Sequence, residues 1–92
     1  MDDNVVYIGT KPFMNYLTSV VMQFTIKKKE AVIIKARGKF ISRAVDVAEV
    51  VRKKFLEDQQ IKIKDIKIDS EEFENREGKK VNVSIIEITL SR

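Results

Sequence analysis

The chain of 92 residues contains no cysteine and no histidine. Without cysteine there are no disulfides and no thiolate metal sites. Without histidine the commonest general base and the commonest metal ligand are missing as well. An enzyme built from this sequence would need a carboxylate–lysine site, and no paired motif of that kind stands out. We therefore expect a protein that is not an enzyme and that uses no metal and no cofactor.

Long apolar stretches are missing too. No apolar run approaches the roughly 18 residues of a transmembrane helix, and no basic-then-apolar signal peptide opens the chain. We expect a single domain over residues 1–92 and a cytoplasmic protein. A chain of this size buries only roughly two thirds of its surface on folding, so we also expect it to gain stability from a partner.

Charged residues are abundant, at 35% of the chain with a formal net charge of +4. Their distribution is uneven. Residues 27–43 contain seven lysines and arginines against Glu30 alone, whereas residues 65–77 contain six aspartates and glutamates. The sequence therefore predicts a basic region and an acidic projection on the same molecule.

Hydrophobic periodicity predicts the element order β-α-β-α-β-β. The predicted strands span residues 4–8, 30–36, 61–69 and 80–90, and the predicted helices span residues 12–25 and 40–56. Thr10 is expected to cap the first helix, with Pro12 in its first turn. A right-handed parallel crossover followed by an antiparallel hairpin gives an α/β fold. We expect a small mixed four-stranded sheet, two helices packed on it, and an extended hairpin arm at residues 71–79.

Two irregularities accompany this pattern. In each of the last two strands the apolar positions change once from odd to even numbers, which predicts either a β-bulge or a strand whose halves face different partners. The second helix is apolar over about half of its circumference, more than one buried contact needs. Either a second subunit covers the excess, or the helix lies deeply buried in a monomer.

Positive charge gathers in two loops that follow predicted strands. The segment "KARGK" at residues 35–39 leaves the second strand, and "GTK" at residues 9–11 leaves the first. If these strands are parallel neighbours, both loops lie at one edge of the sheet and lead into helix N-termini, which favour anions. Lys11, Arg37, Lys39 and Arg43 would then face a polyanion. Neither loop matches a nucleotide-binding motif.

Three segments, "NVVYIGTKPFMNYL", "VIIKARGKFISRAVDVAEVVRKKFL" and "VNVSIIEITL", closely resemble the Alba family of archaeal chromatin proteins. The resemblance implies a homodimer that binds double-stranded DNA largely without sequence preference, is associated with the chromosome, and also binds RNA. It implies that Phe55 lies where family dimers associate side by side along DNA. The nucleic-acid-binding residues that the resemblance implies by position are Lys11, Asn15, Arg37, Lys39, Arg43 and, at the tip of the arm, Arg76, Lys79 and Lys80. We add Thr10, Tyr16 and Lys35, which lie in the same segments, to the predicted nucleic-acid-binding residues.

The chain departs from the family pattern in three places. The first family loop often carries a lysine pair that can be acetylated, and Thr10 replaces one of these lysines here. Glu57 replaces a proline after the second helix, and the arm is unusually acidic. These departures predict DNA binding that is weaker or more selective than that of an abundant coating protein.

Two other functions stay open at this point. RNA is a rival target, because Tyr7, Tyr16 and Phe73 are candidates for stacking on unpaired bases, although Tyr7 and Tyr16 also fit core packing. A protein–protein interaction module is the second alternative, in which the wide helix face and the acidic arm bind another protein.

Overall fold

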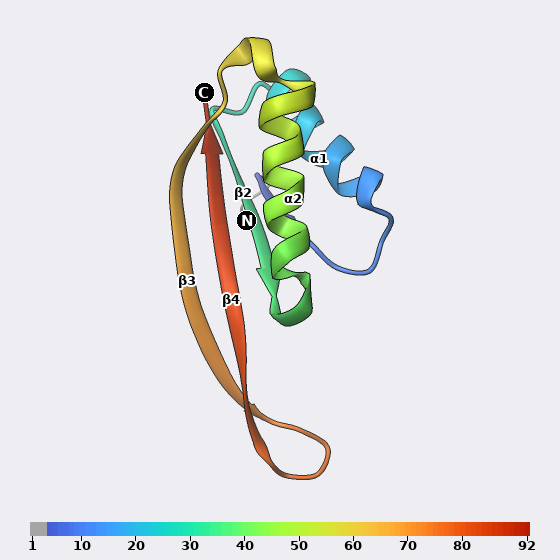
Figure 1. The fold of residues 1–92 in the computed structure, drawn as a ribbon, viewed down its shortest axis with the longest axis vertical. Coiled ribbons are helices and arrows are strands. Elements are labelled where there is room, and N and C mark those ends of the chain that lie inside the picture. The colour runs from blue at the N-terminus through green and yellow to red at the C-terminus, as the bar shows by residue number, and fades with distance from the viewer. Residues whose placement is uncertain (1–3) are drawn as a thin grey trace.

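The computed structural model describes residues 4–92 and has the predicted element order and α/β fold (Figure 1). Two short 3₁₀ turns, Gly38–Phe40 and Glu57–Gln59, and one π turn, Val51–Phe55, interrupt the regular elements. The helices and strands are β1 (Val5–Tyr7), α1 (Phe13–Thr25), β2 (Ala31–Arg37), α2 (Ile41–Val50), β3 (Lys62–Glu74) and β4 (Lys80–Ser91).

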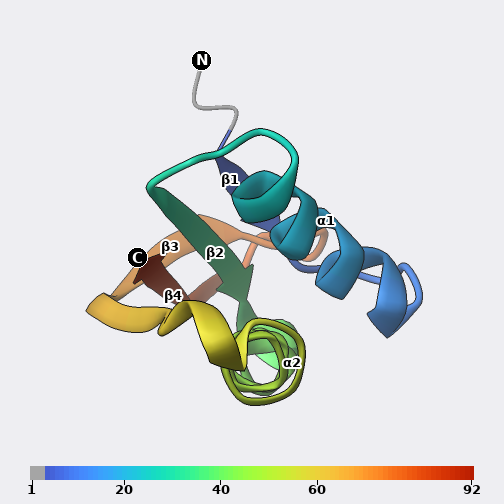
Figure 2. The ribbon, with the colours of Figure 1, turned by 90° about the horizontal axis from the view of Figure 1, so that it is seen from above.

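The four strands form one sheet in the order β1-β2-β4-β3. β1 runs parallel to β2, and the other two pairings are antiparallel. β2 is a central strand, since it has a neighbour on each side. Both helices lie on one face of the sheet, and the opposite face of the described chain carries no helix (Figure 2). No helix within residues 4–92 is long and apolar enough to cross a membrane.

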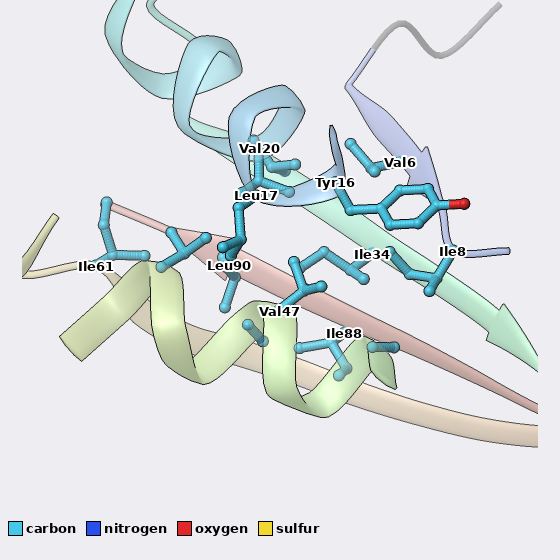
Figure 3. Packing of buried hydrophobic residues seen from close by; sticks show 14 of the residues in the cluster. Val6, Ile8, Tyr16, Leu17, Val20, Ile34, Val47, Ile61, Ile88 and Leu90 are labelled. Atoms are coloured by element: carbon cyan, nitrogen blue, oxygen red, sulfur yellow. The ribbon is translucent and has the colours of Figure 1, made fainter. Parts of the chain in front are cut away.

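The hydrophobic core lies between the two helices and the sheet (Figure 3). Val20 of α1, Ile34 of β2, Val47 of α2 and Leu90 of β4 are all completely buried. Each comes from a different element, so the core joins every layer of the body. Burying a valine, leucine or isoleucine side chain stabilises a fold by about 1.5–3 kcal/mol.

The arm is the part of the β3–β4 hairpin that extends beyond the helices, and it gives the molecule a length of 49 Å against 25 and 24 Å in the other directions (Figure 1). β3 is longer than predicted, because it continues to Glu74 rather than ending near residue 69. Every residue of β3 is exposed. The arm is therefore held together by the hydrogen-bond ladder between β3 and β4 rather than by a hydrophobic core of its own.

The two changes of apolar phase have different causes. In β3 the register with β4 shifts between Ile63 and Asp65, as a β-bulge does. In β4 the register runs without a break, so the first of the two predicted explanations, a β-bulge, does not apply to this strand. Ile86 and Ile88 are buried under the helices, whereas the preceding apolar residues face the other side of the sheet. The phase of β4 thus changes where the strand leaves the cover of the helices.

The ends of the helices differ from the prediction. α1 begins at Phe13, with Pro12 rather than Thr10 at the N-cap and no side-chain capping bond, so the expected Thr10 cap is wrong. The predicted second helix begins with the turn Gly38–Phe40, and the π turn Val51–Phe55 follows its α-helical part. Glu49 and Lys53, one helical turn apart, form an ion pair at 3.6 Å.

At the end of the body opposite the arm, Arg92 ties three segments together. Its guanidinium donates to the backbone oxygen of Phe24 at 2.6 Å and to the side-chain oxygen of Gln59 at 2.8 Å. Its backbone N–H donates to the oxygen of Glu30 at 3.1 Å. The last residue of the chain therefore connects the end of α1, the start of β2 and the turn before β3.

Candidate nucleic-acid interface

The loops that follow β1 and β2 lie at the same edge of the sheet, as predicted from parallel pairing. Tyr7 is the register partner of Lys35, and the backbone N–H of Ile8 donates to the oxygen of Lys35 at 2.8 Å. Arg43 of α2 crosses to the first loop and donates to the backbone oxygen of Gly9 at 3.2 Å. Two segments distant in sequence therefore share one edge, which we call the loop edge. Its exposed cations are Lys11, Arg37 and Lys39.

Tyr16 fixes the shape of the first loop. Its hydroxyl accepts hydrogen bonds from the backbone N–H groups of Gly9 and Lys11, each at 2.9 Å. Its ring is only 7% exposed, and the Arg43 guanidinium lies 5.7 Å from the ring centroid. Of the two roles considered for Tyr16, base stacking and core packing, the structure shows core packing. A buried ring is not available to stack on a base, so Tyr16 acts on the loop edge through the backbone.

Gly38 allows the second loop to turn. Its φ of +54° lies in the left-handed region, which glycine adopts at the lowest cost. An added Cβ would lie 3.7 Å from a methyl group of Val83, which is an ordinary contact, so backbone conformation rather than space requires glycine here. The turn places Lys39 beside Phe40, with its Nζ 5.4 Å from the ring centroid.

Acidic residues of the hairpin partly neutralise the cations of β2. Lys35 Nζ lies 3.4 Å from the Glu87 carboxylate, and Arg37 Nη2 lies 3.6 Å from the Glu71 carboxylate. The Arg37 guanidinium also lies 5.9 Å from the centroid of the Phe73 ring. These side chains are between one third and three fifths exposed, so each pair is solvated and weak. The sequence pattern did not reveal the Glu87 pair, although opposite charges on adjacent strands are its signal.

The tip of the arm is a tight turn that Asn75 organises. Its side-chain oxygen accepts from the backbone N–H groups of Glu77 and Lys79 at 2.9 and 3.0 Å. Gly78 supplies a φ of +77°. The tip cations Arg76, Lys79 and Lys80 are exposed, but Lys80 lies 3.7 Å from Glu72. The tip lies beyond the loop edge along the hairpin, so the two basic groups are separate in one chain (Figure 1).

The remaining predicted site residues lie on the exposed side of α1 or beyond it. Thr10 and Asn15 are exposed near Lys11. Phe55 is 48% exposed and lies apart from the loop edge, beside an apolar groove of about 110 Å³ that α1 lines with Met14, Leu17 and Met22 among others. Within residues 4–92, no group of three or more acidic, histidine or cysteine side chains is arranged to hold a metal ion.

Comparison with known proteins identifies the family. The Alba family profile matches residues 4–70. A "DNA/RNA-binding protein Alba" from Methanocella arvoryzae is 54% identical over 91 residues, which cover 99% of this chain and 92% of that protein. "DNA/RNA-binding protein Alba 1" from Archaeoglobus fulgidus is 52% identical over 92 residues, covering 100% and 99%. The chain belongs to the Alba family.

Solved structures agree with this assignment. Alba from Thermoplasma volcanium superposes with a TM-score of 0.85 at 50% identity, covering 96% of this chain and 99% of that one. A protein from Trypanosoma brucei, titled ALBA1, gives a TM-score of 0.71 at 23% identity, covering 100% of this chain and 71% of that one. The second likeness concerns the fold alone.

Proposed function

We propose that this protein is a dimeric, non-enzymatic nucleic-acid-binding protein of the chromosome, located in the cytoplasm, and that it binds duplex DNA mainly through phosphate contacts. The observation that carries the proposal is the loop edge, which carries Lys11, Arg37 and Lys39 and where Arg43 donates a hydrogen bond to Gly9. Two helices also begin there, and their N-terminal N–H groups favour anions. The names of the archaeal relatives, which include both DNA and RNA, support the same class of ligand.

Phosphate contacts fit this edge better than base readout. Its cations are exposed. Lysine and arginine contacts to phosphate position a protein on DNA without reading its sequence. Because Glu71 and Glu87 compete with phosphate for Arg37 and Lys35, binding is weaker than the number of cations suggests. The direct contacts assigned to the body are those of Thr10, Lys11, Asn15, Lys35, Arg37, Lys39 and Arg43.

The arm supplies a second set of contacts. Arg76, Lys79 and Lys80 lie at the tip of a hairpin that extends past the loop edge, so they reach the duplex at a distance from the body (Figure 1). Arginine and lysine side chains at the tip of such an arm suit the minor groove, which proteins enter with these residues.

The dimer surface that we propose is the uncovered part of the helix-bearing face. Ile66 and Ile68 of β3 are 52% and 80% exposed although their register partners, Ile88 and Ile86, belong to the core. Val45 of α2 is a further exposed apolar side chain, at 42%. We call this set the isoleucine face. A second copy of the chain would bury it and would account for the wide apolar surface of α2.

Phe55 provides a separate contact between dimers. Its ring and the exposed side chains of Met14 and Met22 form an apolar surface on the α1 side of the body, away from the isoleucine face. Dimers bound side by side on DNA would join through it.

The test is a titration of binding against salt. Affinity for a random 20-base-pair duplex, measured by fluorescence anisotropy at several salt concentrations, should give a linear fall of log K with log salt. The slope should be about −0.9 per phosphate neutralised. An affinity independent of salt would exclude the phosphate-contact mechanism. A parallel titration with structured RNA decides the leading alternative, and the protein–protein module predicts no binding to either.

A further inference from the structure

The helix-free face of the sheet carries a row of side chains in which Lys35 is joined by residues that the proposed duplex contacts do not use. Tyr7 of β1, Lys35 of β2, Glu87 of β4 and Lys67 of β3 are successive register partners, so they form one row across all four strands. The next row contains Arg37. An aromatic ring, cations and a carboxylate thus share the face of the sheet that the helices leave open. Figure 2 shows that both helices lie on the other face.

Tyr7 is the exposed aromatic of this row. It is 69% exposed, whereas Tyr16 is 7% exposed. Lys35 Nζ lies 5.8 Å from the centroid of the Tyr7 ring and 3.4 Å from the Glu87 carboxylate. A lysine so placed holds the ring through a cation–π contact while most of the ring surface stays open.

A hollow of about 410 Å³ adjoins the ring. Tyr7, Lys35, Arg37 and Glu71 line it together with apolar side chains that include Ile85. Its volume falls within the roughly 300–1,000 Å³ of small-ligand sites. The hollow therefore offers a flat aromatic ring, two cations and a carboxylate to a group about the size of one nucleotide.

We infer that this face binds single-stranded RNA, with an unpaired base stacked on Tyr7 and the adjoining phosphates at Lys35 and Arg37. The inference rests on the proposed nucleic-acid-binding function and adds to it a surface centred on Tyr7, which shares Lys35 and Arg37 with the duplex contacts. Duplex DNA keeps its bases stacked inside the helix, so a stacking ring on an open sheet serves only unpaired bases. Glu87 favours RNA, because a carboxylate repels phosphate but accepts a hydrogen bond from the 2′-hydroxyl that DNA lacks.

The test compares three fluorescently labelled probes: a 12-residue oligouridine, a 12-residue oligothymidine and a 20-base-pair DNA duplex. In the full chain, Tyr7→Leu should weaken oligouridine binding at least about fivefold, as loss of one stacked base does. Duplex binding by Tyr7→Leu should change less than about twofold. Tyr7→Phe, which keeps an aromatic ring, should bind oligouridine as tightly as the wild type does. Ile26→Ala removes another exposed apolar side chain, 66% exposed at the end of α1, and should change neither.

Intrinsic fluorescence gives an independent reading, because the chain has no tryptophan and two tyrosines. Oligouridine should quench the emission of the wild-type protein and leave that of Tyr7→Phe, which reports the buried Tyr16, unchanged. Equal losses for duplex and oligouridine in Tyr7→Leu, or no loss for oligouridine, would overturn the inference. If Tyr7→Leu weakens oligothymidine binding as much as oligouridine binding, the assignment to RNA is wrong. If the wild-type protein binds none of the three probes, the proposed function itself fails.

Discussion

Arg37 at the end of β2 and Glu71 in the arm lie 3.6 Å apart, guanidinium nitrogen to carboxylate oxygen, across 34 residues of sequence. Phe73 lies on the same guanidinium, 5.9 Å from ring centroid to Arg37 Cζ. The acidic arm therefore does more than project from the body. It holds one of the cations that we assign to DNA, and a phosphate must compete with Glu71 for it.

Removing that competition should strengthen binding. We expect Glu71→Gln to raise the affinity for duplex DNA about two- to fivefold at low salt, because an exposed ion pair of this kind contributes about 0.2–1 kcal/mol. The gain should shrink as salt screens both interactions. Fluorescence anisotropy provides the measurement. Glu57→Gln, at the far end of the body, makes the same change of net charge and is the control. Equal gains in both variants would show that only net charge matters.

Substitutions in the loop edge should weaken binding without altering sequence preference. Arg37→Ala and Lys39→Ala should each lower the affinity for every duplex sequence by a similar factor and should make the salt dependence shallower by about one unit of slope. Lys28→Ala removes an exposed lysine from the turn after α1 and should leave the slope unchanged. If neither loop variant differs from Lys28→Ala, the loop edge does not contact phosphate.

The hydroxyl of Tyr16 should matter for stability. Tyr16→Phe leaves the N–H groups of Gly9 and Lys11 without their acceptor, which should lower the free energy of unfolding by about 1–3 kcal/mol. Chemical denaturation measures this loss. Tyr7→Phe removes the hydroxyl of an exposed tyrosine and should stay within about 0.5 kcal/mol of the wild type. Similar values for the two variants would contradict the role that we assign to the buried hydroxyl.

The isoleucine face predicts the oligomeric state. The wild-type protein should sediment at twice its chain mass of 10.7 kDa, and Ile68→Asp should sediment as a monomer because a charge at a buried apolar interface is costly. Ile26→Asp introduces the same charge at another exposed isoleucine and should remain dimeric. A dimer that survives Ile68→Asp unchanged would place the subunit contact on another surface.

Phe55 should affect binding to long DNA only. Phe55→Ala should keep the mass of the dimer and the affinity for a short duplex that accommodates one dimer. It should make binding to a duplex of several hundred base pairs less cooperative, since neighbouring dimers lose their apolar contact. Electrophoretic titration of both lengths distinguishes these effects. An unchanged binding curve on the long duplex would remove Phe55 from contacts between dimers.

Sequence periodicity predicted the element order, the sheet and the meeting of the two loops, because each depends on local patterns and on the handedness of the crossover. The π turn Val51–Phe55 could not be predicted in this way, since the residues around it keep a helical pattern. The Thr10 cap was wrong because Pro12 takes the N-cap and the hydroxyl of Tyr16 binds the loop instead. That hydroxyl is four residues beyond Pro12, and no capping rule anticipates it.

The ion pairs of the candidate site were harder to predict from the sequence than the fold. The basic and acidic segments were evident, but the pairs of Lys35 with Glu87 and Arg37 with Glu71 depend on strand register and on the path of the hairpin. A one-residue change of register would move each acid to the other face of the sheet. The phase changes in β3 and β4 made that register uncertain until the bulge between Ile63 and Asp65 was located.

The bonds of Arg92 to Phe24, Gln59 and Glu30 give the two ends of the molecule unequal stiffness. We expect that the end connected by Arg92 resists bending. We expect the hairpin, which only the hydrogen-bond ladder between β3 and β4 holds together, to deform most easily at its outermost turn. Its outer amides should therefore exchange with deuterium much faster than those near Arg92. If the protein binds duplex DNA as we propose, this difference would let the arm fit grooves of different width while the body keeps its phosphate contacts.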